Sequence, residues 1–407
     1  MKKNLFLASL LSVGLAFSAV SCDSNDDPTP EVPATDVDYT AENASAWGNY
    51  MKNVGRLLNT DSENLYNAWA VNYNNTGKTY AELFKSHDAS TGYSSIQSCA
   101  QEIVEKCAEI ANEVGTAKIG DPYNLYVGGD EDGALLAVES WYSWHSIDDY
   151  SNNIVSIKNS YYGIYIDGEA VTANAIESAV PAEHSLAKAL ENTTIGKAVD
   201  AAINDAWKAI QAIPAPFRNH IVSSQTEAAM AACSKLQKLL SEVEAEDGSV
   251  IGADDVNLKD AVNNIPEAEL QAIVNHYVDN VVVPTYKKLQ EKNKALLAAV
   301  DAFAANPSNE GFTATCNAWL AAREPWEKSE AFLFGPVDEF GLDPNMDSWP
   351  LDAPAIVQIM KSESWSSLIW EEGDDDAAVE SAQNVRGFHT LEFLVFKDGK
   401  ARTVPAK

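Results

Sequence analysis

The feature of this sequence that most constrains its fold is a helical periodicity that recurs over almost its whole length. Apolar residues return at spacings of three and four in "SIQSCAQEIVEKCAEIANEVG", and "TIGKAVDAAINDAWKAIQAI" is rich in strong helix formers. Strand-like alternation is rare, and its best instance, "GIYIDGEAV", predicts a short hairpin or loop. The pattern therefore predicts an all-α protein made of packed helical bundles.

The chain is long enough to divide into more than one domain. It has 407 residues, of which 46% are hydrophobic, so it can bury a sizeable core. The polar, glycine-bearing stretch "EVEAEDGSVIGADDVNLKDAVNN" is the strongest candidate for a boundary. We therefore expect one helical bundle domain at residues 38–250 and a second at residues 251–407.

The charge of the chain excludes some classes of partner. Its net charge is −32 and its pI is near 4.4. Proteins that bind nucleic acid do so through basic surfaces, and anionic lipid attracts polybasic segments. We therefore predict no nucleic-acid partner, and no membrane contact except through a lipid anchor.

The N-terminus has the pattern of an export signal. Residues 1–22 combine two early lysines, an apolar run and small residues before Cys22, and the ending "AVSC" resembles a bacterial lipobox. This predicts an exported protein whose Cys22 is lipidated and anchored in the outer membrane, on its periplasmic or its surface face. An ordinary signal peptide cut nearby is the alternative. Residues 23–37, rich in proline and acid, predict a disordered tether.

Four further cysteines follow the proposed anchor. Cys99 and Cys107 lie eight residues apart in one helical pattern, which separates them by ~12 Å along the axis, too far for a bridge within that helix. No cysteine or histidine cluster has the spacing of a zinc site. We expect Cys99, Cys107, Cys233 and Cys316 to be buried free thiols, although bridges between helices stay open.

The segment "NVRGFHTLEFLVF", residues 384–396, carries three polar groups in an apolar pattern that predicts one helix. Arg386, His389 and Glu392 follow one another at steps of three, and residues three apart share a helix face. We therefore expect the guanidinium, the imidazole and the carboxylate to leave the same side of this helix.

Two further segments align polar groups in a similar way. In "AREPWEKSEAFLFGP", Arg323, Glu327 and Glu330 fall at i, i+4 and i+7 around an internal proline. In "ESWYSWHSIDDYSNNI", a single helix would align these residues along one face: Glu139, Tyr142, Ser143, Ser146, Asp149 and Tyr150. Serines and tyrosines are not typical of a solvated face, so this second stripe predicts a buried or ligand-facing surface.

The stripes also have a purely structural explanation. A histidine such as His389 is often a hydrogen-bonded core or interface residue. Arginine and glutamate side chains between two bundles could pair with one another and leave no ligand site. From the residues alone, both explanations stay open.

The same segments resemble motifs of the imelysin-like proteins. "GFHTLEFLVF" is similar to the family's GxHxxE motif, with Gly387, His389 and Glu392 in its fixed places, and "VESWYSWHSIDDYSNNI" is similar to its ES-x-x-S stretch, which begins at Glu139. "AWLAAREPWEKSEAFLFGP", "DSWPLDAPAI" and "AIQAIPAPFRNHI" resemble further family segments. Together the resemblance spans most of residues 40–400.

The order of these segments departs from the family's usual order. In most members the helix that corresponds to Arg323 and Glu327, called the Arg-Glu helix, and the GxHxxE helix come first. Here the half that contains the ES-x-x-S stretch precedes both. The resemblance therefore implies a circular permutation, with the old C-terminal half at about 40–246 and the old N-terminal half at about 264–400. It further implies two similar four-helix bundles packed face to face, with the polar stripes at their interface.

The resemblance implies a role in bacterial iron uptake. Our leading hypothesis is an envelope lipoprotein that binds a metal or a metal-linked, anionic ligand, with iron or another divalent metal as its cofactor and other envelope iron-uptake proteins as partners. Oxygen donors and one imidazole suit iron or manganese, and arginines suit an anionic chelator. The predicted metal ligands are His389 and Glu392. The predicted ligand-binding residues are Arg323, Glu330, Glu139, Ser140, Ser143, Asp149 and Arg386.

Two other functions stay open. A zinc peptidase needs about three protein ligands and a general base, and the HExxH pattern is absent. His389 and Glu392 could supply two ligands and Glu330, Glu139 or Asp149 a third, but nearby arginines would compete for these carboxylates. We therefore favour binding over hydrolysis and predict no catalytic residue. A non-catalytic envelope interaction protein is the third hypothesis.

Overall fold

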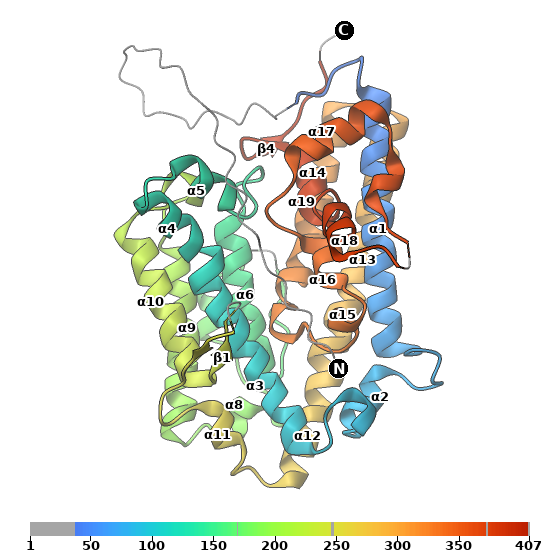
Figure 1. The fold of residues 1–407 in the computed structure, drawn as a ribbon. Helices are drawn as coiled ribbons and strands as arrows, with labels where there is room; N and C mark the ends of the chain where they lie inside the picture. The colour runs from blue at the N-terminus through green and yellow to red at the C-terminus, as the bar shows by residue number, and fades with distance from the viewer. Residues whose placement is uncertain (1–36, 169, 246–247, 372, 406–407) are drawn as a thin grey trace.

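The computed structural model describes residues 37–168, 170–245, 248–371 and 373–405, and its main helices pack into two groups of four (Figure 1). The first group contains α3 (Ile96–Glu113), α6 (Ser146–Tyr162), α9 (Thr194–Gln211) and α10 (Ser224–Leu240). The second contains α1 (Ala44–Ala70), α13 (Val283–Ala305), α14 (Asn309–Glu327) and α19 (Gly387–Val395). The prediction of an all-α protein is confirmed.

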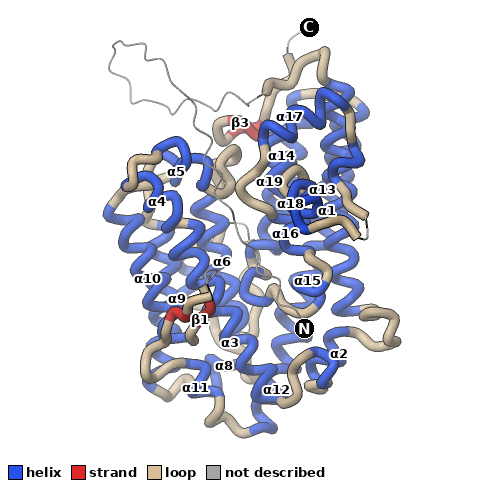
Figure 2. Tube along the Cα trace, viewed as in Figure 1, coloured by secondary structure: helices blue, strands red, loops and turns tan. Residues whose placement is uncertain are grey.

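Shorter elements connect these helices. Among the described residues, strand occurs only in two antiparallel two-residue pairs (Figure 2), β1 (Val243–Glu244) with β2 (Val250–Ile251) and β3 (Phe396–Lys397) with β4 (Lys400–Ala401). The shorter α-helices are α2 (Tyr80–Lys85), α4 (Gly120–Val127), α5 (Glu131–Ala137), α7 (Ala173–Glu177), α8 (Leu186–Ala189), α11 (Leu258–Val262), α12 (Glu267–Tyr277), α15 (Pro336–Glu339), α16 (Leu342–Asp347), α17 (Ala353–Ser362) and α18 (Asp376–Gln383). Two π-helical turns, Val114–Lys118 and Val278–Val282, and four 3₁₀ turns, Ala89–Thr91, Phe217–Asn219, Glu330–Phe332 and Trp365–Leu368, complete the set.

Helix α1 packs with helices from the far end of the chain. Figure 1 shows it beside α13, and its main packing partner is α13. Trp47 Nε1 donates to the carbonyl of Leu394 at 3.0 Å, and the Tyr50 hydroxyl donates to the carbonyl of Val385 at 2.9 Å. The domain division at residue 250 stays a prediction, but it does not anticipate this packing of α1 with the C-terminal helices.

Helices α6 and α19 lie where the two groups meet. Every residue of α19 is buried, and so is almost every residue of α6. A helix that is buried on all sides must lie inside the molecule, and its polar groups then need protein partners. Asn153 of α6 donates to the carboxylate of Glu327 in α14 at 2.6 Å, which links the two groups. Polar residues on α6 and α19 are therefore candidates for an internal site.

The helix that carries His389 starts later than its apolar pattern predicts. Residues 384–396 do not form one helix, because Arg386 is extended and α19 begins at Gly387. Gly387 has φ +86°, and a Cβ at this position would lie 2.5 Å from the carbonyl oxygen of Met346 in α16. A left-handed residue ends helical continuity, so Arg386 does not share a face with His389 and Glu392.

The predicted helical stripe from Glu139 to Tyr150 is also interrupted. Helix α5 ends at Ala137 and α6 begins at Ser146, so residues 138–145 form a turn region. Ser140 and Trp144 have φ values of 52° and 61°, which a helix excludes. The first part of the stripe therefore reaches the interior from a turn, and only the part from Ser146 onward lies on a helix.

The remaining structural expectations divide by location. Cys99, Cys107, Cys233 and Cys316 are buried free thiols, as predicted. The described part of residues 163–171 forms a loop without strand. Cys22, the signal segment 1–22 and residues 23–36 of the tether lie outside the described residues. Within the described ranges, no helix combines the length and the apolar character needed to cross a membrane.

Replacing Gly387 by alanine should destabilise the protein more than the same change at Gly129. Both glycines have positive φ, but a Cβ at Gly129 meets nothing within 4 Å, whereas at Gly387 it meets backbone. We expect Gly129→Ala to cost about 1 kcal/mol and Gly387→Ala at least about 3 kcal/mol in the free energy of unfolding, measured with urea. Equal losses would show that α16 yields freely at this contact.

Candidate functional site

The centre of the candidate site is the fully buried guanidinium of Arg323 in α14. Its Nη2 lies 2.6 Å from Glu139 Oε1 and 2.7 Å from Glu327 Oε1. Its Nε lies 3.3 Å from Asp149 Oδ2, and its Nη1 donates to Asp347 Oδ1. One arginine thus gathers carboxylates from the α5–α6 turn, α6, α14 and α16.

His389 lies in the same cluster with both ring nitrogens engaged. Its Nε2 is 3.1 Å from Asp347 Oδ1 and 3.3 Å from Glu139 Oε1. Its Nδ1 is 3.0 Å from Glu392 Oε2, and since a carboxylate accepts, Nδ1 carries the hydrogen of this bond. The ring of Trp349 packs against the imidazole, with centroids 4.8 Å apart. Glu392 therefore sets the orientation of the imidazole, and Nε2 faces the carboxylates.

Lys118 adds a second fixed positive charge to the cluster. It ends the π-helical turn Val114–Lys118, and its Nζ lies 3.1 Å from Glu139 Oε2 and 4.0 Å from Glu330 Oε1. Pi-helical turns are rare in proteins, and those that occur often lie at functional sites. Glu330 lies just beyond α14, at the start of a 3₁₀ turn, so it reaches Lys118 instead of Arg323.

Short hydrogen-bonded contacts hold the turn at residues 138–145 against the cluster. The Ser140 hydroxyl donates to Asp149 Oδ2, and the Ser146 hydroxyl donates to the Glu139 carbonyl at 2.6 Å. The backbone N–H of Ser143 donates to Glu392 Oε1 at 2.7 Å. Both oxygens of Glu392 are therefore engaged, one by His389 and one by Ser143.

The cluster contains more negative than positive groups. We call it the acid cluster and define it by six carboxylates, each with a side chain at most 7% exposed, two permanent cations and one imidazole. Its members are Glu139, Asp149, Glu327, Glu330, Asp347, Glu392, Arg323, Lys118 and His389. Isolated buried charges are costly, so such an excess has to be balanced by bound protons or by a bound cation.

Some members of the acid cluster are held in their charged forms. Burial raises the pKa of Glu139, but Lys118 and His389 outweigh burial and lower that pKa to about 2. Burial also opposes ionisation of Asp347, but Arg323 and His389 bring its pKa well below the usual range. Burial and the charge of Arg323 lower the pKa of His389, yet Asp347 and Glu139 outweigh both and raise it well above 6.5. These carboxylates therefore favour the protonated imidazole, in which Nε2–H faces Glu139 and Asp347, while Arg323 Nη2 lies 3.3 Å from the same nitrogen.

Other members are held in their neutral forms. Burial raises the pKa of Glu327 and of Glu330 well above the usual range, although Arg323 and Lys118 respectively oppose the change. Burial also raises the pKa of the neighbouring Asp343 from 3.8 to about 7, with a further contribution from Asp347. Protons thus balance part of the excess negative charge.

The structure brings together most of the residues predicted from sequence. Arg323, Glu139, Asp149, His389 and Glu392 belong to the acid cluster, as does Glu330. Ser140 and Ser143 bind members of it through a hydroxyl and a backbone N–H. Arg386 is an exception, because its Nη2 donates to Asp61 and its Nη1 lies 3.4 Å from the Leu368 carbonyl. The prediction that Arg386 lines the same surface as His389 is therefore wrong.

Sequence reasoning missed two members of the acid cluster. Asp347 lies in the segment "DSWPLDAPAI", which resembles a family segment, but neither periodicity nor a motif singles out its carboxylate. Lys118 reaches the cluster only because of the π-helical turn, for which no sequence signal was found. Two overlapping triads have donor atoms within 4.8 Å of one another, Glu139–Asp347–His389 and Glu327–Glu330–Asp347, and both depend on Asp347.

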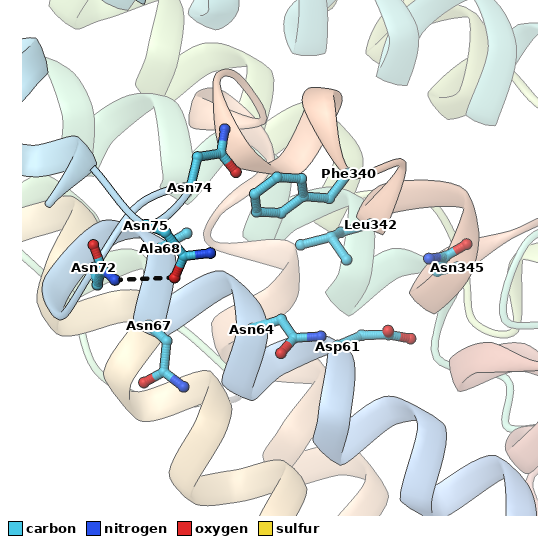
Figure 3. Close-up of a pocket in the computed structure, with 10 residues that line it drawn as sticks. All are labelled: Asp61, Asn64, Asn67, Ala68, Asn72, Asn74, Asn75, Phe340, Leu342 and Asn345. Atoms are coloured by element: carbon cyan, nitrogen blue, oxygen red, sulfur yellow. Dashed lines mark hydrogen bonds between the residues drawn. The ribbon is translucent and has the colours of Figure 1, made fainter. Parts of the chain in front are cut away.

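Two surface concavities lie away from the acid cluster. One of about 420 Å³ lies between α1, the turn that follows it and α16 (Figure 3), and one of about 540 Å³ lies beside β3 and β4. No member of the acid cluster lines either of them. The carboxylates of the cluster are at most 7% exposed, so the cluster lies in the polar interior of the protein.

Comparisons with known proteins agree on one family. The sequence profile of the imelysin family matches residues 25–243 and 282–407, which is most of the chain. A crystal structure of an imelysin peptidase from Bacteroides ovatus is similar, with 57% identity, a TM-score of 0.82, and coverage of 91% of this chain and 99% of that one. "Iron-regulated protein A" from Synechococcus elongatus is 32% identical over 123 residues, 30% of this chain and 31% of that protein. The chain therefore matches only about a third of the length of this relative.

Replacing Arg323 by methionine should strongly destabilise the protein. The change leaves four neighbouring buried carboxyl groups, of which Glu139 and Asp347 are held ionised, without their shared cation. We expect a loss of about 3–5 kcal/mol in the free energy of unfolding. Lys235→Met is the matched control, because the pair of Lys235 with Asp205 is 3.5 Å long and more than half exposed, and should cost less than about 1 kcal/mol. Similar losses in both variants would contradict the central role of Arg323.

Asp343→Asn should remove part of the pH dependence of stability. Because the pKa of Asp343 is raised from 3.8 to about 7, the folded protein binds more protons than the unfolded chain between these values. Its contribution to stability therefore falls as the pH rises across this window. At pH about 8 the variant should be more stable than the parent by about 1–2 kcal/mol, and the difference should vanish below pH about 4. Urea unfolding at several pH values measures this, and a constant difference would contradict the assignment.

Proposed function

The chain belongs to the imelysin family, and from that premise we propose that it is an exported, envelope-anchored protein that binds a metal ion, or a metal-linked ligand, in iron uptake. The observation that carries this proposal is the excess of buried carboxylates around the Nε2 atom of His389. Kinship with a relative named an iron-regulated protein supports the choice of iron. The lipidated Cys22, the outer-membrane location and the circular permutation are part of the same proposal and rest on the sequence.

The donor atoms fit a transition-metal ion. His389 Nε2, Glu139 and Asp347 offer one imidazole nitrogen and two carboxylate groups within 4.8 Å of one another. Such mixed nitrogen and oxygen donors suit iron or manganese, whereas a thiol-rich set would favour zinc or copper. In this proposal these three residues hold the ion, and the positive charge of the ion balances the excess negative charge of the acid cluster.

Glu392 then has a different role from the one expected from its motif. We assign it to orienting His389, because one of its oxygens accepts from Nδ1 and the other from the backbone of Ser143. Carboxylates that bind the outer nitrogen of a ligating histidine fix its tautomer and raise its basicity. The three-residue spacing of His389 and Glu392 in the motif then places one metal ligand, His389, beside the carboxylate that orients it, Glu392.

A proton and the ion compete for the same position. In the protonated imidazole, Nε2–H points to Glu139 and Asp347, which are the other two proposed ligands. Binding of a cation therefore displaces this proton. Since the pKa of His389 is raised well above 6.5, affinity should increase as the pH rises through the neutral range.

We expect the metal-stripped protein to bind about one Fe²⁺ or Mn²⁺ ion and to release a proton on binding. Calorimetric titration under argon, repeated in buffers of different ionisation enthalpy, measures affinity and proton release together. His389→Gln should abolish binding, and Glu392→Gln should weaken it about 10–100-fold. His276→Gln is the control, because its ring contacts the Gly163 carbonyl at 2.8 Å and the Asn280 amide at 3.1 Å, and neither partner belongs to the acid cluster. Absence of binding by the parent, or equal binding by all variants, would overturn the proposal.

Peptidase activity is the competing function, since the similar protein from Bacteroides ovatus is named an imelysin peptidase. A hydrolytic metal needs an open position for water and a free general base. In the described structure both oxygens of Glu392 are engaged, and Arg323 occupies the neighbouring carboxylates. Incubation of the zinc-loaded protein with unfolded casein separates the two functions. Cleavage that depends on His389 and stops when a chelator is added would show that the protein is a peptidase, and the binding proposal would be replaced.

A further inference from the structure

A second polar concavity lies outside the acid cluster, between the C-terminal half of α1, the turn that follows it and α16 (Figure 3). Six of its ten lining residues are asparagines, from three separate segments: Asn64, Asn67, Asn72, Asn74, Asn75 and Asn345. Its volume is about 420 Å³. Nothing in the function proposed for the acid cluster uses this place.

The concavity carries almost no net charge. Asp61 is its single charged lining residue, and Arg386 neutralises it by donating from Nη2. A cation would have to displace Arg386, and an anion would meet no free positive group among the lining residues. The lining therefore selects a neutral ligand.

Asn72 bonds Asn75 and the backbone N–H of Gly77 within the turn, whereas the amide groups of Asn64 and Asn345 are placed to hydrogen-bond a ligand. Each asparagine side chain both donates and accepts, as a hydroxyl does. The side chain of Asn64 is exposed on α1 and has no hydrogen-bond partner within the described ranges. Asn345 is 6% exposed, and its Oδ1 accepts from Gln383 at 2.9 Å, which holds the side chain in place. Asn74 and Asn75 both have positive φ, which asparagine tolerates, and the backbone N–H of Tyr73 donates to the Lys78 carbonyl at 2.8 Å across the turn.

An apolar surface completes the lining. Phe340 is 37% exposed, and Figure 3 shows its ring beside Leu342, with Asn64 and Asp61 of α1 on the opposite side. A sugar ring has the matching chemistry, with hydroxyls around its edge and a C–H face that packs on an aromatic ring. A volume of about 420 Å³ has room for about two hexose rings.

We propose that this asparagine-lined concavity is a binding site for a neutral carbohydrate. Asn64 and Asn345 bind hydroxyls of the sugar, and Phe340 packs on its C–H face. The sugar is either a free oligosaccharide or part of a polymeric glycan, which present the same chemistry. This site is independent of metal binding at the acid cluster.

The test uses the full chain as exported and the neutral trisaccharides maltotriose, cellotriose and chitotriose as probes. We expect at least one of them to bind, measured by saturation-transfer NMR and by titration calorimetry. Asn64→Ala and Phe340→Ala should each weaken that binding about tenfold, whereas Phe340→Tyr keeps the ring and should bind like the parent. Asn192→Ala, an exposed asparagine elsewhere, is the control. Thermal unfolding of each variant verifies that the fold is intact.

Further experiments distinguish a free oligosaccharide from a polymeric glycan and test competing ligands. Retention on particles of starch, cellulose or chitin indicates a polymeric glycan, and binding of the trisaccharide without retention indicates a free oligosaccharide; both support the proposal. Calcium and adenosine are counter-probes. The proposal is overturned if no trisaccharide binds, if calcium or adenosine binds there instead, or if Asn64→Ala and Phe340→Ala bind like the parent.

Discussion

A buried guanidinium surrounded by carboxylates is the interaction on which the rest of this structure depends. Arg323 is inaccessible to water, and a charge in that position is tolerated only when hydrogen-bonded counter-ions surround it. Ionised Glu139 and Asp347 reach it from the α5–α6 turn and α16. The carboxyl groups of Asp149 in α6 and Glu327 in α14 complete its surroundings, so both helical groups and their connections contribute. The acid cluster can therefore form only when the two helical groups pack together.

The acid cluster combines opposite protonation states within a few ångströms. Positive neighbours hold Glu139 and Asp347 in their ionised forms, while burial holds Glu327 and Glu330 in their neutral forms. Such divergence between neighbouring groups is frequent at functional sites, although structural ion networks produce it too. The His389 Nε2 atom lies between two ionised carboxylates. A metal ion could replace the proton on this nitrogen and bind the same two carboxylates, which favours the functional explanation.

Helix α16 connects the acid cluster with the asparagine-lined concavity. Its last residue, Asp347, belongs to the acid cluster, whereas Leu342 and Asn345 line the concavity. Its backbone also lies directly against Gly387, where α19 begins. This short helix had no recognisable sequence signal of its own, because one turn and a half is too short for an apolar period to be recognised.

The sequence by itself determined the helical class and the residues at the centre of the acid cluster. The three-to-four spacing of apolar residues specifies helices locally, and the Arg-Glu and His-Glu pairs lie within single helical segments, where sequence spacing sets distance. Tertiary structure decided the rest. Gly387 meets the carbonyl of Met346, which turns Arg386 away, and positive φ at Ser140 places Glu139 in a turn. Asp347 and Lys118 join from segments whose spacing from His389 carries no geometric information, because only packing between helices sets distances across such separations.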